Sequence, residues 1–445
     1  MVQLDDRAAT RRLLDRLGFG PLPGELAAAR GFDATLDALL APGPDPGVAA
    51  TPPPALAPIP TSPRSDATDR AAEQQARQTG QAQLTTWWLD RMTATTAPLP
   101  ERLVWFWHGH FATSAQKVRE PAALLAQNQT FRTLGLGDFR TLAHAMVVDP
   151  AMMVWLDAAQ NKVGAANENL AREFMELFAL GVGNYAESDV REAARALTGY
   201  TVDRTDGDVR LVARRQDTGP KTIFGTTGPI DAPRFVDMVV DRPESARFVA
   251  SRLWYRLVSS STPPTPAVLG DLTDAYGPGT DVRGLLRALA TSAPFRDSAT
   301  TVVKQPVEWA VGLMRAVGVR ASAVVAAPGG RPGRPRRDPL VTQLTALGQV
   351  PFRPPSVGGW PAGPAWLTPS AGLSRLALAE AVVAGSPLPP GPAGAAARID
   401  WARQVLGVDA WSPRSLAALQ QVAGEADPRR TLTVAALTPE YVVST

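Results

Sequence analysis

Two histidines stand close together in an aromatic segment, residues 105–111, which reads Trp-Phe-Trp-His-Gly-His-Phe. Imidazole is a common ligand of catalytic metal ions, so His108 and His110 are candidate metal ligands. In a continuous helix, residues i and i+2 point about 200° apart, so both could reach one ion only if Gly109 interrupts the helix. The alternative is that both histidines are buried and hydrogen-bonded among the aromatic rings.

Carboxylates and a guanidinium gather on the segment 167–181, which begins with a capping asparagine and ends with a glycine, as a single helix would. With 3.6 residues per turn, Arg172, Glu173 and Glu176 share a polar stripe beside an apolar face. Carboxylates act as general acids and bases, and they also bind divalent cations. The candidate catalytic residues are therefore Glu173, Glu176 and Arg172 of this segment, together with Asp157, which precedes it. The alternative is a solvated or purely structural stripe.

Side-chain amides form a third set of candidates, because an amide offers both a donor and an acceptor to a polar ligand such as a sugar. The candidate substrate-binding residues are Asn128, Asn161, Asn167, Asn169 and Arg195. Amides equally cap helices and tie loops. Arg195 could also pair with Glu173 or Glu176 across a helical hairpin, which is the structural alternative for all three.

The composition limits the chemistry. The 445 residues include no cysteine, which excludes disulfides, thiolate catalysis and cysteine-ligated metals. A divalent metal, the cofactor we consider, would need histidine or carboxylate ligands. The 45 Lys and Arg residues nearly balance the 42 Asp and Glu residues, for a formal charge of +3, so we expect no nucleic-acid binding.

The start of the chain, residues 1–7, carries two acidic residues and lacks the basic start and apolar core of a signal peptide. We therefore expect a cytoplasmic protein, or one that is exported together with a partner. No run of about 18 apolar residues occurs, so we expect no membrane span.

The elements that must position these side chains are predicted to be helices. Apolar residues recur with helical spacing along most of the chain, including a long stretch over 66–93. Strand-like sequence is limited to 209–213 and 222–224, on either side of a turn at 217–220. The prediction is a mainly α protein, a multi-helical orthogonal array with at most one small β-hairpin.

No stretch resembles a boundary between two independent cores, so we expect residues 1–445 to form a single elaborated helical domain. Three segments rich in proline and glycine interrupt the helical pattern. They are predicted to be loops within this domain, at 42–65, 326–339 and 386–395.

Several segments, taken in order along nearly the whole chain, resemble the signature blocks of the bacterial domain-of-unknown-function 1800 family. They lie at residues 106–111, 156–161, 167–178, 193–200, 217–222, 246–254, 304–308 and 354–361. The resemblance assigns no reaction. It does imply a possible partner, a sulfatase-like protein of the domain-of-unknown-function 1501 family, because members of the two families tend to be encoded side by side.

Two functions compete at this point. The first hypothesis is a metal-assisted hydrolase acting on a polar polymer such as polysaccharide, with the histidines, carboxylates and amides converging on one cleft. The alternative is a non-catalytic helical scaffold or accessory protein that binds a partner, in which the same groups form an internal network. An open pocket with unpaired carboxylates would favour the enzyme, and fully paired groups would favour the scaffold.

Overall fold

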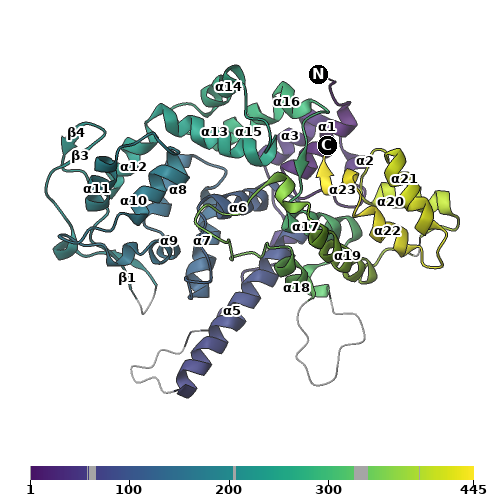
Figure 1. Cartoon of the computed structure of the whole chain (residues 1–445), viewed down its shortest axis with the longest axis horizontal. Helices are drawn as coiled ribbons and strands as arrows, with labels where there is room; N and C mark the ends of the chain where they lie inside the picture. Colours follow the sequence, from purple (N-terminus) through teal and green to yellow (C-terminus); the bar gives the residue numbers. More distant parts are fainter. Residues whose placement is uncertain (1, 58, 60–66, 204–206, 325–338, 390) are drawn as a thin grey trace.

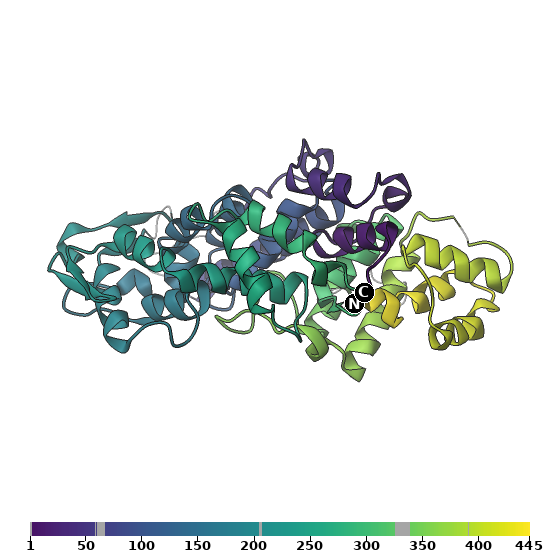
Figure 2. The same cartoon turned by 90° about the horizontal axis from the view of Figure 1, so that it is seen from above.

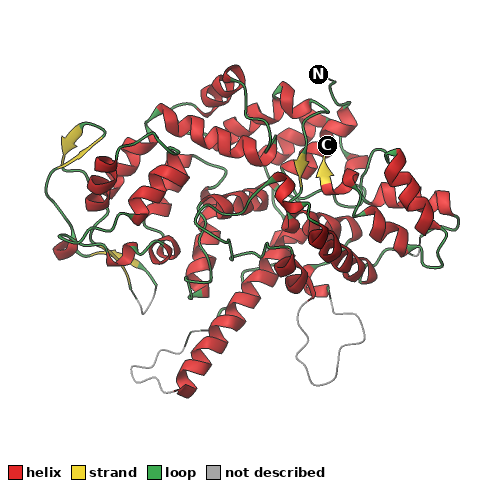
Figure 3. Cartoon of the chain, in the orientation of Figure 1, coloured by secondary structure: helices red, strands yellow, loops and turns green. Residues whose placement is uncertain are grey.

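The computed structural model describes residues 2–57, 59, 67–203, 207–324, 339–389 and 391–445. Helices dominate these residues, and strands are few and short (Figure 3). The mainly α class predicted from the periodicity is therefore confirmed. Two views at right angles show an elongated molecule, with α8–α12 at one end and α20–α22 at the other (Figures 1 and 2).

The first third of the chain holds the N-terminal helices and the long helix. These are α1 (Asp6–Arg16), α2 (Glu25–Ala28), α3 (Phe32–Leu40), α4 (Pro46–Ala49), α5 (Ala67–Ala94), α6 (Leu99–His110) and α7 (Pro121–Leu134). The long helix α5 agrees with the stretch expected at 66–93, and α4 lies inside the predicted loop 42–65. Residues 58 and 60–65 of that loop lie outside the described residues.

The middle of the chain forms one end of the molecule and then returns to its centre along α13 (Figure 1). Its helices are α8 (Phe139–Val147), α9 (Pro150–Trp155), η1 (Ala158–Gln160), α10 (Asn169–Glu173), η2 (Phe174–Ala179), α11 (Glu187–Ala196), η3 (Ala213–Arg215), α12 (Ala232–Val240) and α13 (Pro243–Leu257). One of these, η2, is a π-helix that continues α10 directly.

The last part of the chain adds helices around α17 and forms the other end of the molecule. They are α14 (Pro266–Tyr276), α15 (Val282–Thr291), α16 (Ala293–Arg296), α17 (Pro306–Val317), η4 (Ala321–Ala323), α18 (Pro339–Ala346), η5 (Gly363–Trp366), α19 (Pro369–Ala384), α20 (Ala395–Val405), α21 (Pro413–Ala423), α22 (Arg429–Ala435) and α23 (Pro439–Val442). The loop predicted at 326–339 lies outside the described residues up to 338. The one predicted at 386–395 contains no helix until Ala395, with residue 390 outside the description.

Many of these helices begin at a proline that follows a capping side chain. Thr265, Thr368 and Ser412 each accept a hydrogen bond from a backbone N–H in the first turn of a helix whose first residue is proline. Proline suits this position because its missing N–H would have no partner inside the helix and its fixed φ is already helical. These local signals explain where helices start along the chain.

The strands form three separate two-stranded antiparallel pairs. They are β1 (Tyr200–Val202) with β2 (Val209–Leu211), β3 (Lys221–Ile223) with β4 (Thr226–Gly228), and β5 (Val302–Val303) with β6 (Val443–Ser444). The two strand-like segments of the sequence therefore do not pair with each other. Each has a nearer partner in the chain, and a short loop costs less entropy to close than a longer one.

A contiguous cluster of buried apolar side chains runs from Ala9 to Val442 through both ends of the molecule. The two chain ends meet beside it, where β6 pairs with β5 and the buried Arg16 donates to the Ser444 carbonyl at 2.8 Å. The single-domain organisation stays a prediction, which this continuity supports. No helix within the described residues is both long and apolar enough to cross a membrane.

Candidate functional site

The two clustered histidines lie at the end of α6, an unbroken helix, and they face different neighbours. His108 Nε2 accepts a hydrogen bond from the backbone N–H of Phe352 at 3.0 Å. His110 Nε2 lies 2.8 Å from the carbonyl oxygen of Phe178, so this nitrogen carries the proton and donates it. Both imidazoles are only 2% exposed, so each ties α6 to a distant segment of the chain.

Burial sets the protonation of both histidines. The loss of hydration lowers the pKa of His108 and of His110 to about 3 each, and the cations Arg252 and Arg256 lower the pKa of His110 further. Both rings are therefore neutral near pH 7, and Nδ1 of His110 has no hydrogen-bond partner. Within the described residues, no three His, Asp or Glu side chains are grouped as metal ligands, so the metal prediction finds no ligand set there.

The candidate catalytic residues are mostly engaged in pairs. Asp157 contacts the ammonium of Lys117 at 2.7 Å. Glu176 accepts a hydrogen bond from the hydroxyl of Tyr185 at 2.5 Å. Arg172 forms ion pairs with two other carboxylates, those of Glu168 at 3.0 Å and Glu187 at 2.7 Å. These contacts join neighbouring segments of one end of the molecule.

Glu173 is the exception among these carboxylates. Its side chain is half-buried, and no hydrogen bond or ion pair involves it among the described residues. Burial raises the pKa of Glu173, and the charge of Glu176 raises it further, while Arg172 opposes both effects. A carboxyl group with a raised pKa is what a general acid requires, but Glu173 does not line either of the cavities described below.

Three of the candidate asparagines form a chain of capping contacts. Asn161 donates to the carbonyl of Ala194 and accepts from the backbone N–H of Asn167, each at 2.9 Å. The side chain of Asn167 in turn accepts from the backbone N–H of Asn169 at 2.9 Å. Asn128 differs, because it is 2% exposed and neither polar atom of its side chain has a partner. The side chains of Asn161 and Asn167 therefore tie together the segment that leads into α10, whereas Asn169 takes part only through its backbone.

Arg195 does not pair with Glu173 or Glu176, so the structural alternative considered for these three residues was wrong. Its guanidinium contacts Asp217 at 2.8 Å and Glu192 at 2.8 Å instead. Asp217 lies in the loop before β3, which brings a closer carboxylate to Arg195 than the neighbouring helix does. The side chain therefore fastens that loop onto α11.

The structure does bring two of the sequence segments together, although through the backbone. The His110–Phe178 hydrogen bond joins the histidine segment to η2. The carbonyl of Phe178 lies in the last turn of that helix, where carbonyl oxygens lack partners within the helix. A π-helical turn often marks a functional region, yet here its terminal carbonyl is satisfied by a buried neutral histidine.

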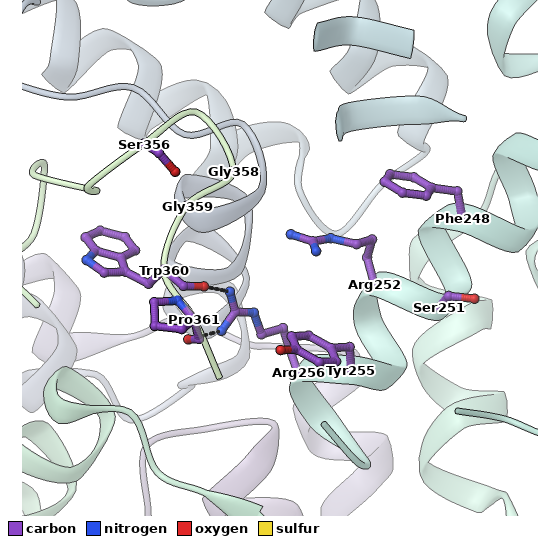
Figure 4. Close-up of a pocket in the computed structure, with 10 residues that line it drawn as sticks. All are labelled: Phe248, Ser251, Arg252, Tyr255, Arg256, Ser356, Gly358, Gly359, Trp360 and Pro361. Carbon is purple, nitrogen blue, oxygen red and sulfur yellow. Dashed lines mark hydrogen bonds between the residues drawn. The ribbon is translucent and has the colours of Figure 1, made fainter. Parts of the chain in front are cut away.

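An open cavity of about 480 Å³ lies between α13 and the segment 356–361 (Figure 4), a size typical of small-molecule sites. We call it the α13 cavity. Its lining contains no Asp, Glu or His. The lining residues are Phe248, Ser251, Arg252, Tyr255, Arg256, Ser356, Gly358, Gly359, Trp360 and Pro361.

The 356–361 wall of the α13 cavity rests directly on α6. A Cβ atom at Gly359 would lie 2.1 Å from the carbonyl oxygen of Gly109, and Gly359 has a φ of +76°. Only glycine meets both conditions without strain. The indole of Trp360 stacks on Trp105, with ring centroids 5.2 Å apart. The glycines and the tryptophan together hold this wall in place.

The two arginines of α13 make different contacts. Arg256 donates to the carbonyl oxygens of Trp360 at 2.5 Å and Pro361 at 3.0 Å, which fastens α13 to the opposite wall. Arg252 extends into the gap toward Gly358 and Gly359 (Figure 4). Its Nε is buried without a partner, and no described residue forms a hydrogen bond or ion pair with its guanidinium.

The charge of this region is positive. Burial lowers the pKa of Arg252, and it lowers the pKa of Arg256 to about 10, where Arg252 also contributes. Both guanidinium groups stay charged near pH 7. A second, smaller cavity of about 20 Å³ shares Arg256 and contains Glu308, but that carboxylate forms an ion pair with Arg102.

Sequence reasoning missed Arg252 and Arg256, although a signal was present. The two residues are four apart, so they lie on the same face of the expected helix, where like charges repel. No acidic residue occurs between Pro243 and Leu257 except Glu244 in the first turn. An unbalanced pair of this kind indicates an external anion or a distant partner.

No curated protein and no solved structure is significantly similar to this chain. A family model described as a protein of unknown function (DUF1800) matches residues 12–443. The match covers the α6 histidines, the 167–181 segment and both walls of the α13 cavity. The chain therefore belongs to the DUF1800 family.

Proposed function

We propose that this chain is a non-catalytic helical binding protein, and that the α13 cavity holds a ligand or a group of a partner. One observation carries the proposal. The cavity is lined by two arginines and three hydroxyl side chains but by no carboxylate or histidine, while most of the carboxylates expected to catalyse are engaged in pairs elsewhere.

The chemistry of the cavity supports binding over hydrolysis. Its hydroxyls, on Ser251, Tyr255 and Ser356, are weak nucleophiles unless a neighbouring base takes the proton. The lining offers no such base. Guanidinium, hydroxyl and aromatic groups do bind and orient polar ligands, since they supply hydrogen bonds and an apolar surface at the same place.

A metal-assisted hydrolase of a polar polymer is the second candidate. The raised pKa of Glu173, half-buried beside Glu176, favours it, because a general acid needs a carboxyl group whose pKa is raised. This candidate requires a substrate to reach Glu173, which does not line the α13 cavity.

The proposal is tested by measuring binding and turnover in the same samples of the full chain. Neutral and anionic oligosaccharides are titrated calorimetrically, and the mixtures are then chromatographed for cleavage products. We expect binding without cleavage, and we expect Ser251→Trp to abolish binding by filling the cavity. Arg247→Trp is the matched control, because Arg247 is exposed on the same helix and does not line the cavity.

Cleavage that disappears in Glu173→Gln would overturn the proposal and establish the hydrolase. Binding that survives Ser251→Trp would place the ligand elsewhere. The sulfatase-like partner expected from the family resemblance is tested by the same pair of variants, because a complex formed through the α13 cavity should tolerate Arg247→Trp and not Ser251→Trp.

A further inference from the structure

We propose that the α13 cavity recognises a tetrahedral oxyanion, the phosphate or sulfate ester of an organic ligand, with Arg252 as the residue that binds the anionic group. The inference rests on the proposed function, because it concerns the same cavity. It names the chemical class of the ligand, which that function leaves open.

The first step is the unused guanidinium of Arg252. Two buried arginines of this chain that have no carboxylate partner, Arg315 and Arg375, donate to backbone carbonyls instead. Arg315 bonds the carbonyl of Gly20 at 3.1 Å, and Arg375 bonds that of Trp366 at 2.9 Å. Arg252 has no acceptor among the described residues, and its Nε is buried. Leaving such a donor unpaired is unfavourable, which an incoming anion would reverse.

The second step is the balance of charge. Arg252 and Arg256 lie one helical turn apart, and two like charges at this spacing repel. The carboxylate that acts on Arg256, that of Glu308, is already paired with Arg102, and none acts on the pKa of Arg252. A phosphate monoester carries nearly two negative charges and a sulfate ester carries one, so either would offset the positive charge of these two arginines.

The third step is the distribution of donors. Arg252 and Tyr255 come from α13, whereas Ser356 and the Gly358 backbone come from the opposite wall. The hydroxyls of Tyr255 and Ser356 have no hydrogen-bond partner among the described residues. Donors on two sides suit the three terminal oxygens of a phosphate or sulfate ester, because these point in different directions, whereas the two oxygens of a carboxylate lie in one plane and are met by a single guanidinium fork.

The fourth step is size. The cavity of about 480 Å³ falls in the range that holds small organic molecules, and a bare phosphate would leave much of it empty. Phe248 and Tyr255 add half-exposed aromatic surface beside Arg252. The oxyanion is therefore one group of a larger ligand whose body rests on these rings.

The experiment uses the full chain and inorganic anions as probes. Thermal unfolding is followed in millimolar phosphate, sulfate, acetate or chloride at matched ionic strength, and apparent affinities are derived from the concentration dependence of the midpoint. We expect phosphate and sulfate to raise the midpoint above the value in chloride. Arg252→Met should weaken this effect at least tenfold, and Arg252→Lys should weaken it less, since the charge stays and the fork is lost.

Arg247→Met is the control for a general loss of positive charge, because Arg247 is exposed on α13 and lies outside the cavity. It should respond to phosphate as the wild type does. Without anion, Arg252→Met should unfold at the same temperature as the wild type or at a higher one, whereas a purely structural arginine would leave the variant less stable.

Equal effects of acetate and phosphate would overturn the tetrahedral assignment, and an unchanged phosphate response in Arg252→Met would overturn the role of Arg252. Either result, with oligosaccharide binding still abolished by Ser251→Trp, would leave the proposed binding function standing. Phosphate binding together with cleavage that depends on Glu173 would overturn the proposed non-catalytic function and leave the oxyanion assignment standing.

Discussion

The buried carboxylate of Asp149 caps a helix, and its burial allows a quantitative prediction of how the stability of the protein depends on pH. It precedes α9, and its Oδ1 accepts from the backbone N–H of Met152 at 2.8 Å and from the side chain of Gln127 at 2.7 Å. The residue is 4% exposed, and no cation contacts it within the described residues. Burial raises the pKa of Asp149 to about 7, against these two hydrogen bonds.

The sign and size of the effect on stability follow from this pKa. The folded protein binds the proton more tightly than the unfolded chain, whose pKa is near 3.8, so folding is favoured at low pH. That contribution is lost as the pH rises from about 4 through about 7. At 1.36 kcal/mol per pKa unit, the difference corresponds to about 4 kcal/mol in the free energy of unfolding.

Replacing Asp149 with asparagine keeps the accepting oxygen and removes the charge, and asparagine caps helices as well as aspartate does. We therefore expect Asp149→Asn to match or exceed the wild type, by up to about 4 kcal/mol above pH 8 and by much less near pH 5. Urea unfolding between pH 5 and 9 measures the difference. Asp138→Asn is the control, because Asp138 caps α8 through a similar bond while being half-buried.

Parallel stability curves for Asp149→Asn and the wild type would refute the reasoning, as would a variant that is less stable at pH 8.5. Either result would mean that water or a rearranged side chain stabilises the charged carboxylate in the folded protein. A change of stability in the Asp138 variant that is independent of pH would report only on that cap, and it would not affect the argument for Asp149.

Further predictions concern the supports of the site. Gly359→Ala forces a Cβ against the Gly109 carbonyl at a positive φ, so it should destabilise the fold by about 1–3 kcal/mol and reduce ligand binding, as denaturant unfolding and calorimetry would show. Unchanged stability would contradict this contact. Glu101→Gln removes the carboxylate shared by the buried Arg91 and the half-buried Arg132 and should cost about 3–5 kcal/mol in urea unfolding, an effect that no exposed Glu→Gln control should match. His110→Phe leaves the Phe178 carbonyl without its donor and should cost about 1–3 kcal/mol without changing bound metal by elemental analysis. Loss of a stoichiometric metal would instead restore the metal hypothesis.

The helical class and many element boundaries could be predicted from the sequence, because the signals are local. The stretch 66–93 differs by one residue at each end from α5 (Ala67–Ala94). Gly181, the expected helix terminator, has a φ of +82°. The same helix begins at Asn169, two residues after the expected cap, and its second half is π-helical. A capping side chain can be recognised from its neighbours, whereas a π turn depends on what the helix packs against.

The candidate site was predicted less well, because residue type does not reveal the partner. Arg195 was a candidate substrate-binding residue, with a pair to a carboxylate of the preceding helix as the alternative, but Asp217 reaches it from a loop. His108 and His110 were candidate metal ligands, and the structure shows each hydrogen-bonded to a backbone group of a distant segment. A sequence pattern shows that a polar group must be satisfied, and the tertiary contacts decide by which atom.

By itself, the sequence determined what depends on neighbouring residues: a mainly helical chain, a set of proline-initiated helices and a family membership. Only the tertiary structure decided that α13 and the segment 356–361, about 100 residues apart, face each other across one cavity. The reason is that the close approach of Gly359 to Gly109 and the isolation of Arg252 depend on distances between segments remote in the chain. Periodicity and capping describe each segment separately and carry no information about those distances.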